Sequence, residues 1–258
     1  MSKDTVLLER RDAVARVTLN RPDVLNSFNG PMFARMRAVL AEIAADRSVR
    51  AVYLTGAGRG FCAGQDISGG VPDGPYGEHL AESWNPVATA IRELDRPVVA
   101  GVNGVAAGAG ANLALAADFV VAAEEASFIQ AFVNIGLVPD TGGTLTVPQL
   151  VGRARATAML MLGEKVPASQ ALAWGLIHQT CPGSELEATG WALAVRLAKM
   201  PTLALGLTKR LINASYENDF RRQLVAEGEA QSIAGRSADH REGIAAFAEK
   251  RRPVFTGG

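Results

Sequence analysis

The sequence predicts an α/β fold, in which a core of alternating strands and helices is followed by a helical C-terminal region. Short apolar runs rich in β-branched residues alternate with amphipathic segments in the first part of the chain. Helical patterns prevail from Arg153 almost to the end. No low-complexity segment or linker divides the 258 residues. We therefore expect a large core over residues 1–195 and a helical region over residues 196–258.

The first elements follow the order strand, strand, helix, strand. Alternation of apolar and polar residues over 5–9 and 13–20 predicts a hairpin. Pro31 favours the start of a helix, and apolar residues at helical spacing continue to about Asp46. The apolar segment 50–55 then predicts a central strand.

Glycine-rich turns separate the elements that follow. Residues 56–70 contain six glycines, a density that serves tight turns and close approach of the backbone to a ligand. We expect a surface loop over 71–77 and a helix over 78–94. Further strands are predicted over 97–102, 119–122 and 127–129. Further helices are predicted over 154–162, 169–173, 185–199, 203–214, 220–234 and 238–251.

The stretch from Pro97 to Asp118 combines a buried strand, a glycine turn and the start of a helix made of small residues. Such a sequence places free backbone N–H groups at a helix N-terminus, where partial positive charge collects. Two ligands fit this arrangement, a phosphate group or a developing oxyanion. Close packing of small side chains explains the pattern equally well.

Residues 97–117 carry no charge and are long enough to cross a bilayer. However, this run contains four glycines and many alanines, and it lacks the basic and aromatic anchors of a membrane span. The N-terminal residues show no hydrophobic signal core. We therefore expect a buried segment in a soluble, cytoplasmic protein.

Composition argues against several functional classes. The 26 basic residues balance the 26 acidic ones, so nothing favours nucleic acid or a membrane surface as a partner. Cys62 and Cys181 are too few for a disulfide framework, and the three histidines lack ligand spacing, so no metal site is expected. The glycine-rich segments match neither a dinucleotide fingerprint nor a Walker loop.

Six segments, in order along the chain, resemble the crotonase (enoyl-CoA hydratase/isomerase) superfamily. They are LNRPDVLNSF at 19–28, GRGFCAGQDI at 58–67, the stretch 97–118, GLVPDTGGT at 136–144, AWGLI at 173–177 and GIAAFAEKR at 243–251. Within the superfamily the chain is most similar to the ring-1,2-epoxyphenylacetyl-CoA isomerases of phenylacetate degradation. The resemblance implies a crotonase-like spiral of ββα turns with a C-terminal helical trimerisation region, assembled as trimers or dimers of trimers.

The resemblance also implies a shared chemistry. Members of the superfamily bind an acyl-CoA thioester and hold its carbonyl between two backbone N–H groups, which stabilise an enolate-like anion. These groups correspond here to the N–H groups of Gln65 and Ala109. The second position is usually glycine in the superfamily, so the alanine is a departure from the pattern.

A second set of residues is implied to bind coenzyme A, which is part of the substrate; no metal or redox cofactor is implied. Alternatively, Asp66 only caps a turn, Lys250 is a solvated lysine and Phe247 belongs to the core. The sequence leaves open whether Tyr76 and Trp84 line the acyl pocket. The residues implied to lie near the adenine are Ala63, Gln65, Asp66 and Ile67, with Phe247 and Lys250 reaching the CoA of a neighbouring subunit.

The acid/base groups depart from those of hydratases, which resemble one another in carrying two glutamates. Asn112 and Phe132 stand at those positions here, and neither side chain can replace a glutamate as a base. Asp140 stands where dienoyl-CoA and epoxyphenylacetyl-CoA isomerases have an aspartate. One carboxylate that removes and returns a proton suffices for a double-bond shift. The other reading of Asp140 is an N-cap for the helix that follows.

The expected function is therefore an acyl-CoA isomerase. It would shift a double bond, or rearrange a ring epoxide to an oxepin, through a thioester enolate with Asp140 as the acid/base. Alternatives are an enoyl-CoA hydratase, another crotonase-type reaction such as dehalogenation or thioester hydrolysis, and a non-catalytic CoA-binding relative. A nucleotide-phosphate binder is a further alternative of a different class.

Overall fold

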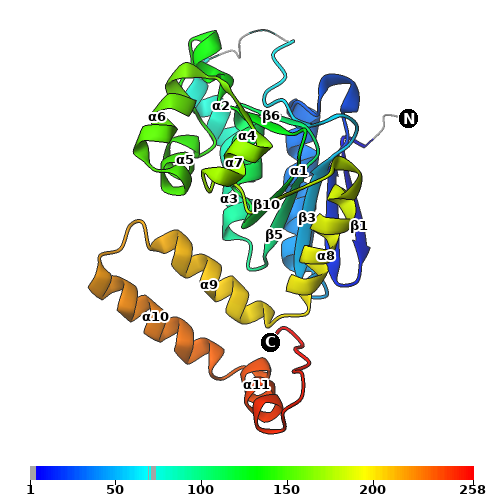
Figure 1. The fold of residues 1–258 in the computed structure, drawn as a ribbon, viewed down its shortest axis with the longest axis vertical. Coiled ribbons are helices and arrows are strands. Elements are labelled where there is room, and N and C mark those ends of the chain that lie inside the picture. The colour runs from blue at the N-terminus through cyan, green and yellow to red at the C-terminus, as the bar shows by residue number, and fades with distance from the viewer. Residues whose placement is uncertain (1–3, 69, 71–73) are drawn as a thin grey trace.

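Two β-sheets form the centre of the computed structural model, which describes residues 4–68, 70 and 74–258 (Figure 1). In the larger sheet the strand order is β1-β2-β3-β5-β7-β10. The first pair is antiparallel and the other pairs are parallel. Its strands are β1 (Val6–Arg11), β2 (Val14–Leu19), β3 (Ala51–Gly56), β5 (Val98–Val102), β7 (Phe119–Ala123) and β10 (Gln179–Cys181).

The smaller sheet has the strand order β4-β6-β8-β9. Its first three strands are parallel and the last is antiparallel. Along the chain, β3, β5 and β7 of the larger sheet are each followed directly by a strand of the smaller one, and then by helical structure. This succession is the expected spiral of ββα turns. The strands of the smaller sheet are β4 (Gly60–Cys62), β6 (Val105–Ala107), β8 (Ser127–Ile129) and β9 (Lys165–Pro167).

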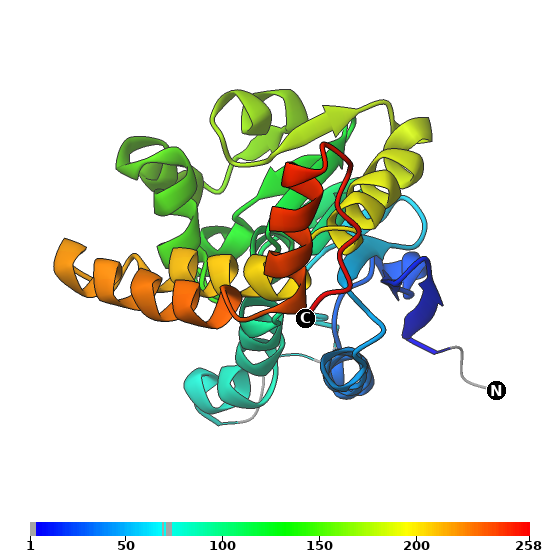
Figure 2. The same cartoon turned by 90° about the horizontal axis from the view of Figure 1, so that it is seen from below.

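Helices cover both sheets and extend beyond them (Figures 1 and 2). The Asn29 side chain caps α1 by accepting a hydrogen bond from the Met32 N–H, as the sequence pattern at Pro31 requires. The α-helices are α1 (Gly30–Ala45), α2 (Tyr76–Glu82), α3 (Trp84–Glu93), α4 (Ala109–Leu115), α5 (Gly143–Val151), α6 (Arg153–Leu162), α7 (Ala168–Ala173), α8 (Leu186–Ala198), α9 (Thr202–Ala214), α10 (Phe220–Ala234) and α11 (Ala238–Ala248). Short 3₁₀ helices are η1 (Pro22–Val24), η2 (Ala131–Ile135) and η3 (Gly183–Glu185).

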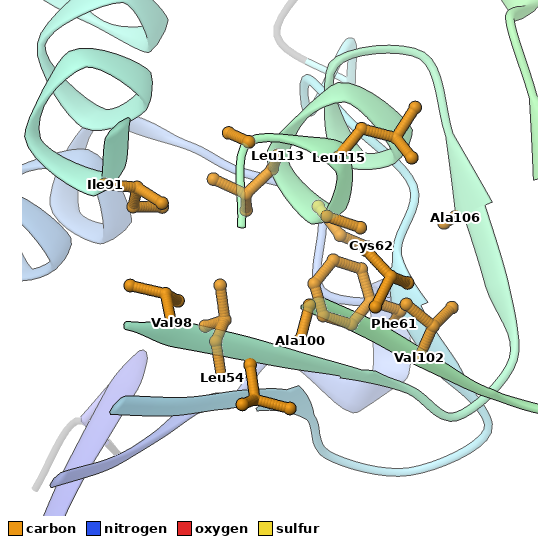
Figure 3. Close-up of a cluster of buried hydrophobic side chains, with 14 of the residues drawn as sticks. Leu54, Phe61, Cys62, Ile91, Val98, Ala100, Val102, Ala106, Leu113 and Leu115 are labelled. Atoms are coloured by element: carbon orange, nitrogen blue, oxygen red, sulfur yellow. The ribbon is translucent and has the colours of Figure 1, made fainter. Parts of the chain in front are cut away.

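The hydrophobic core lies between the larger sheet, the smaller sheet and helices α3 and α4. Figure 3 shows the part of it beneath the glycine turns, where side chains from β3 and β5 meet those from β4 and α4. These residues are almost fully buried, so α4 is held against the sheets by packing on all sides. The labelled members are Leu54, Phe61, Cys62, Ile91, Val98, Ala100, Val102, Ala106, Leu113 and Leu115.

The C-terminal helices attach to the core through α9. The buried Lys209 ammonium donates hydrogen bonds to the Asp118 carboxylate and to the Ile91 carbonyl, each at 2.8 Å. Helices α10 and α11 extend away from the sheets (Figures 1 and 2) and expose apolar side chains such as Phe220 and Phe247. The expected boundary between residues 195 and 196 falls inside α8. Self-association through this region stays a prediction.

Three expectations about individual elements were wrong. The helix expected over 78–94 is two helices, because the chain bends at Ser83, with φ −114° and ψ −88°, between α2 and α3. Strands β4 and β6 were read only as glycine turns. Strands β9 and β10 interrupt the region read as helical from Arg153 onward.

Two further expectations concern the loop over 71–77 and the uncharged stretch over 97–117. The first part of the loop, 71–73, lies outside the described residues, and its last residues are helical from Tyr76 onward. The uncharged stretch divides into β5, β6 and α4. None of the helices in the described part of the chain combines the length and apolar character needed to span a bilayer.

Candidate active site

One cavity gathers most of the residues that the sequence predicts as functional. It has a volume of about 510 Å³ and lies between the turns after β4 and β6, helix α2 and the segment that precedes α5. Much of its wall is apolar, including Leu80, Trp84, Phe132 and Leu137. Six predicted site residues border it, namely Ala63, Gln65, Asp66, Ile67, Ala109 and Asp140.

The backbone around Gln65 is held by Phe28 on the neighbouring segment. The Phe28 N–H donates to the Gly64 carbonyl, and the Asp66 N–H donates to the Phe28 carbonyl, both at 2.8 Å. In a parallel bridge of this kind the residue between these two bonds directs its own N–H away from the partner segment. Among residues 4–68, 70 and 74–258, no group accepts a hydrogen bond from the Gln65 N–H. This donor is therefore free for a ligand.

Asn26 fastens the segment that carries Phe28 to the segment that carries Gln65. Its fully buried side-chain amide donates to three carbonyls within 57–61, at 2.9–3.1 Å. Its Oδ1 accepts from the Arg21 N–H at 2.8 Å. The two sequence motifs at 19–28 and 58–67 thus form one hydrogen-bonded unit, and this unit sets the position of the Gln65 backbone.

The Gln65 side chain is fixed by Trp84. The Trp84 indole Nε1–H donates to the Gln65 Oε1 at 3.0 Å. The indole is buried and packs against the rings of Phe28 and Phe33, with centroids 4.7 and 5.1 Å away. Both Trp84 and Tyr76, whose roles the sequence left open, border the cavity.

The second free N–H belongs to Ala109, the first residue of α4. The N–H groups of a first helical turn have no acceptor within the helix, and the Ala109 N–H has none elsewhere in the described chain. Gly108 precedes it with φ +54°. A Cβ atom at Gly64 would lie 3.4 Å from the Ala109 nitrogen. The turns after β4 and β6 therefore bring the two free N–H groups to neighbouring positions on the cavity wall.

Asp140 borders the same cavity and does not cap α5. That helix begins at Gly143, its N-cap is Gly142, and no side chain caps it. The alternative interpretation of Asp140 as an N-cap is therefore wrong. Its Oδ1 accepts a hydrogen bond from the Thr141 hydroxyl at 2.7 Å. Burial raises the pKa of Asp140, while this hydrogen bond and the charge of His79 partly lower it. A carboxylate with a raised pKa is a stronger base.

The loop that carries Asp140 is held by Asn112, at one of the two hydratase glutamate positions. The buried Asn112 amide donates to the Asp140 carbonyl at 2.8 Å, and its Oδ1 accepts from the Gln130 amide, also at 2.8 Å. The side chain packs directly on Gly143, where an added Cβ atom would lie 2.3 Å from its Nδ2. Asn112 therefore positions the backbone of Asp140.

Substituting Asn112 with alanine is expected to displace this loop. The buried Gln130 amide would lose its acceptor, and the Asp140 carbonyl would keep only the hydrogen bond from the Gly143 N–H. The free energy of unfolding should therefore fall by about 1–3 kcal/mol. Displacement of a catalytic group by about 1 Å can cost a factor of about 100, so we expect kcat to fall by about 10–100-fold with little change in KM. Thermal melts and steady-state kinetics measure both effects. A variant with unchanged kcat would show that Asp140 does not depend on this contact.

Two of the residues implied to bind coenzyme A lie outside the cavity that the others border. Phe247, near the end of α11, and Lys250, just beyond that helix, are exposed and do not border the cavity; their predicted contact with a neighbouring subunit stays a prediction. Asp66 borders the cavity, but its carboxylate is bonded to Ser68 and to the Arg21 guanidinium at 2.9 Å. These partners lower its pKa. The Asp66 side chain therefore caps the turn at Ser68, and its contact with coenzyme A stays a prediction.

His79 is a cavity residue to which the sequence analysis gave no role. Its imidazole Nε2 is buried, and none of the described residues forms a hydrogen bond with it. The signal in the sequence was the spacing of Tyr76, His79 and Leu80, which places all three on one face of a helix and, in the structure, on the cavity wall. That signal was missed because the segment before Glu78 was read as a loop.

Comparison with known proteins agrees with the arrangement of the site. Residues 9–258 match the family model of the enoyl-CoA hydratases/isomerases. The 1,2-epoxyphenylacetyl-CoA isomerase of Escherichia coli (strain K12) is 46% identical over 259 residues, covering 98% of each chain. A Rhodobacter capsulatus protein named "Probable enoyl-CoA hydratase" is 45% identical over the full length of both chains.

Solved structures show the same likeness. The crystal structure of an enoyl-CoA hydratase from Bacillus anthracis superposes with a TM-score of 0.93 at 30% identity, over 98% of this chain and 100% of the other. Fold and full-length sequence similarity thus agree, and the chain belongs to the enoyl-CoA hydratase/isomerase family of the crotonase superfamily.

Proposed function

We propose that the protein is an acyl-CoA isomerase that shifts a double bond or rearranges a ring epoxide through a stabilised thioester enolate. The observation that carries this proposal is that Asp140 is the single available carboxylate that the described residues contribute to a cavity which also presents the free N–H groups of Gln65 and Ala109. Asn112 holds a loop and Phe132 is apolar, so neither performs the proton transfers of a glutamate. The Escherichia coli relative named as an isomerase supports the same choice.

In the proposed reaction the thioester carbonyl accepts hydrogen bonds from the Gln65 and Ala109 N–H groups. Asp140 removes a proton from the carbon next to that carbonyl, and the electron pair moves onto the carbonyl oxygen. Preorganised donors stabilise this charge without rearranging during the reaction. Return of the proton to the carbon two positions further along completes the double-bond shift. For a ring epoxide, the same anion would favour rearrangement to an oxepin.

The apolar walls would assist this chemistry by excluding water. Phe132 and Leu137 border the cavity beside Asp140, where exclusion of water strengthens the electrostatic interactions of the anion. The absence of water would also disfavour hydration of the product. The setting that we propose is phenylacetate degradation, because the Escherichia coli relative is named as an isomerase of 1,2-epoxyphenylacetyl-CoA.

The coenzyme A portion would lie along Ala63, Asp66 and Ile67, at the open end of the cavity, where the Ile67 side chain is 64% exposed. Phe247 and Lys250 would complete that site from a neighbouring subunit in a trimer or a dimer of trimers. The exposed apolar side chains on α10 and α11 support such an assembly.

The test is a spectrophotometric assay of the purified protein with three substrates, a 3-enoyl-CoA, crotonyl-CoA and an aromatic ring-epoxide CoA. We expect a double-bond shift or oxepin formation, with negligible addition of water to crotonyl-CoA. Rapid hydration of crotonyl-CoA would contradict the proposal and favour the activity named for the Rhodobacter capsulatus relative. Turnover of none of the three, with coenzyme A ligands still bound, would favour a non-catalytic relative.

A further inference from the structure

The His79 side chain borders a largely apolar cavity, and its imidazole carries a polar atom without a partner among the described residues. Its Nε2 is buried, and no group in the described part of the chain forms a hydrogen bond with it. The walls around it include Leu80, Trp84, Phe132 and Leu137. A buried polar group without a partner is costly, so such groups call for a further partner. Here the cavity itself offers the space for one.

The position of His79 separates it from the two free N–H donors. His79 extends from α2, whereas those donors belong to the turns after β4 and β6. His79 and Asp140 border the same cavity. In the proposed function the thioester carbonyl is bound by the Gln65 and Ala109 N–H groups. The His79 Nε2 is therefore left for a different oxygen.

The backbone of His79 is held in place, which favours a role for a fixed side chain. Its carbonyl accepts a hydrogen bond from the Ser83 hydroxyl at 2.6 Å, at the bend between α2 and α3. Trp84, the next residue, donates to Gln65. His79 is thus connected through this bend to the segment that positions one of the N–H donors.

We infer that the His79 Nε2 forms a hydrogen bond with an oxygen atom on the acyl group, separate from the thioester carbonyl, and so selects oxygen-bearing acyl groups over hydrocarbon ones. This inference rests on the proposed function only in placing the acyl group in this cavity. A site built to hydrogen-bond a ligand oxygen discriminates against the analogue that lacks it, because its own polar group is then left without a partner.

The test measures equilibrium binding of two unreactive ligands, phenylacetyl-CoA and 2-hydroxyphenylacetyl-CoA, by titration calorimetry. The phenol both donates and accepts, so it pairs with either tautomer of the imidazole. In the wild type we expect the hydroxylated ligand to bind about tenfold more tightly, the effect of one hydrogen bond in a dry site. In His79→Leu the preference should disappear while phenylacetyl-CoA binds as before.

Three further variants sharpen the result. His79→Gln retains an amide near the Nε2 position, so part of the preference should return. Tyr76→Phe removes a hydroxyl from the same helix and the same cavity, and it should leave the preference unchanged. His79→Met provides a second apolar substitution if the leucine variant does not fold.

The inference is overturned if the wild type shows no preference, if it binds neither ligand, or if a folded apolar variant keeps the preference. Loss of affinity for both ligands to the same extent would indicate a structural role and would also overturn it. These measurements involve no turnover. Failure of the proposed isomerase activity would instead appear in the assay with 3-enoyl-CoA and ring-epoxide substrates, while the binding preference stayed intact.

Discussion

Replacing Asp140 with asparagine is expected to lower kcat for the double-bond shift by about 10²–10⁴-fold, the usual contribution of a positioned acid/base group. Asparagine has nearly the same shape, and its carbonyl oxygen can still accept the hydrogen bond from the Thr141 hydroxyl. The variant therefore removes proton transfer and leaves the loop in place. Affinity for phenylacetyl-CoA, measured by calorimetry, serves as the control. A kcat within threefold of the wild-type value would contradict the assignment of Asp140.

The same substitution is expected to stabilise the protein near neutral pH. Burial raises the pKa of Asp140 in the folded state, so the folded protein keeps this proton to a higher pH than the unfolded chain. The free energy of unfolding therefore decreases as the pH rises from the unfolded pKa of about 3.9 through the raised folded value. Asparagine avoids that loss, so its gain in Tm at pH 7 should vanish at low pH.

Wild-type kcat/KM should change over the same pH range in the opposite sense to stability. The basic form of Asp140 is the form that accepts the substrate proton, so activity should rise with pH through the raised pKa. The residual activity of the asparagine variant should lack this rise. Thermal melts and pH–rate profiles of the two proteins therefore test one titration by two independent measurements.

Replacing Ala109 with proline is expected to lower kcat by about 10²–10³-fold, because it removes one of the two donors proposed to stabilise the enolate. Ala109 is the first residue of α4, a helical position that tolerates proline since its N–H has no helical partner. The preceding residue is Gly108, at φ +54° and ψ −129°. These angles are the mirror image of the extended conformation that residues before proline favour. Glycine adopts them without strain, so a proline at position 109 should not distort the turn.

A matched variant separates loss of the donor from a change in the helix. Ala109→Gly keeps the N–H and has the residue usual at this position in the superfamily, so its kcat should stay close to that of the wild type. Far-ultraviolet circular dichroism of both variants should report an unchanged helix content. If the proline variant folds and retains wild-type kcat, the Ala109 N–H is not part of the oxyanion site.

The sequence was sufficient to predict the long elements, because their patterns extend over several turns or strand residues. Helix α1 and helix α10 were expected within a residue or two of their observed bounds. Strand β8 has only three residues and was expected over 127–129, but β4, β6, β9 and β10, which are equally short, were missed because three residues define no clear periodicity. Their existence follows from pairing with neighbouring strands, which a local pattern does not contain. The bend at Ser83 was missed because the helical pattern continues across it from α2 into α3.

The candidate site was likewise predicted only in part from the sequence. Gln65, Ala109 and Asp140 were predicted from motifs, and the structure brings all three to one cavity. The structural role of Asn112 depends on Asp140, a partner 28 residues away. The position of His79 at the cavity depends on packing between separate elements. Single polar residues of this kind carry no repeating pattern. Only the folded structure shows which groups they face and which lack a partner.

The two free N–H groups belong to turns that follow adjacent parallel strands, β4 and β6. Neighbouring strands in a sheet are about 4.8 Å apart, so the separation of these donors is tied to main-chain pairing and is largely independent of side-chain identity. Substitutions on the cavity wall can therefore alter the reaction while the anion site persists. A pair of donors held by the main chain, next to side chains that can be exchanged without disturbing it, would let proteins of this fold carry out different reactions after a few substitutions.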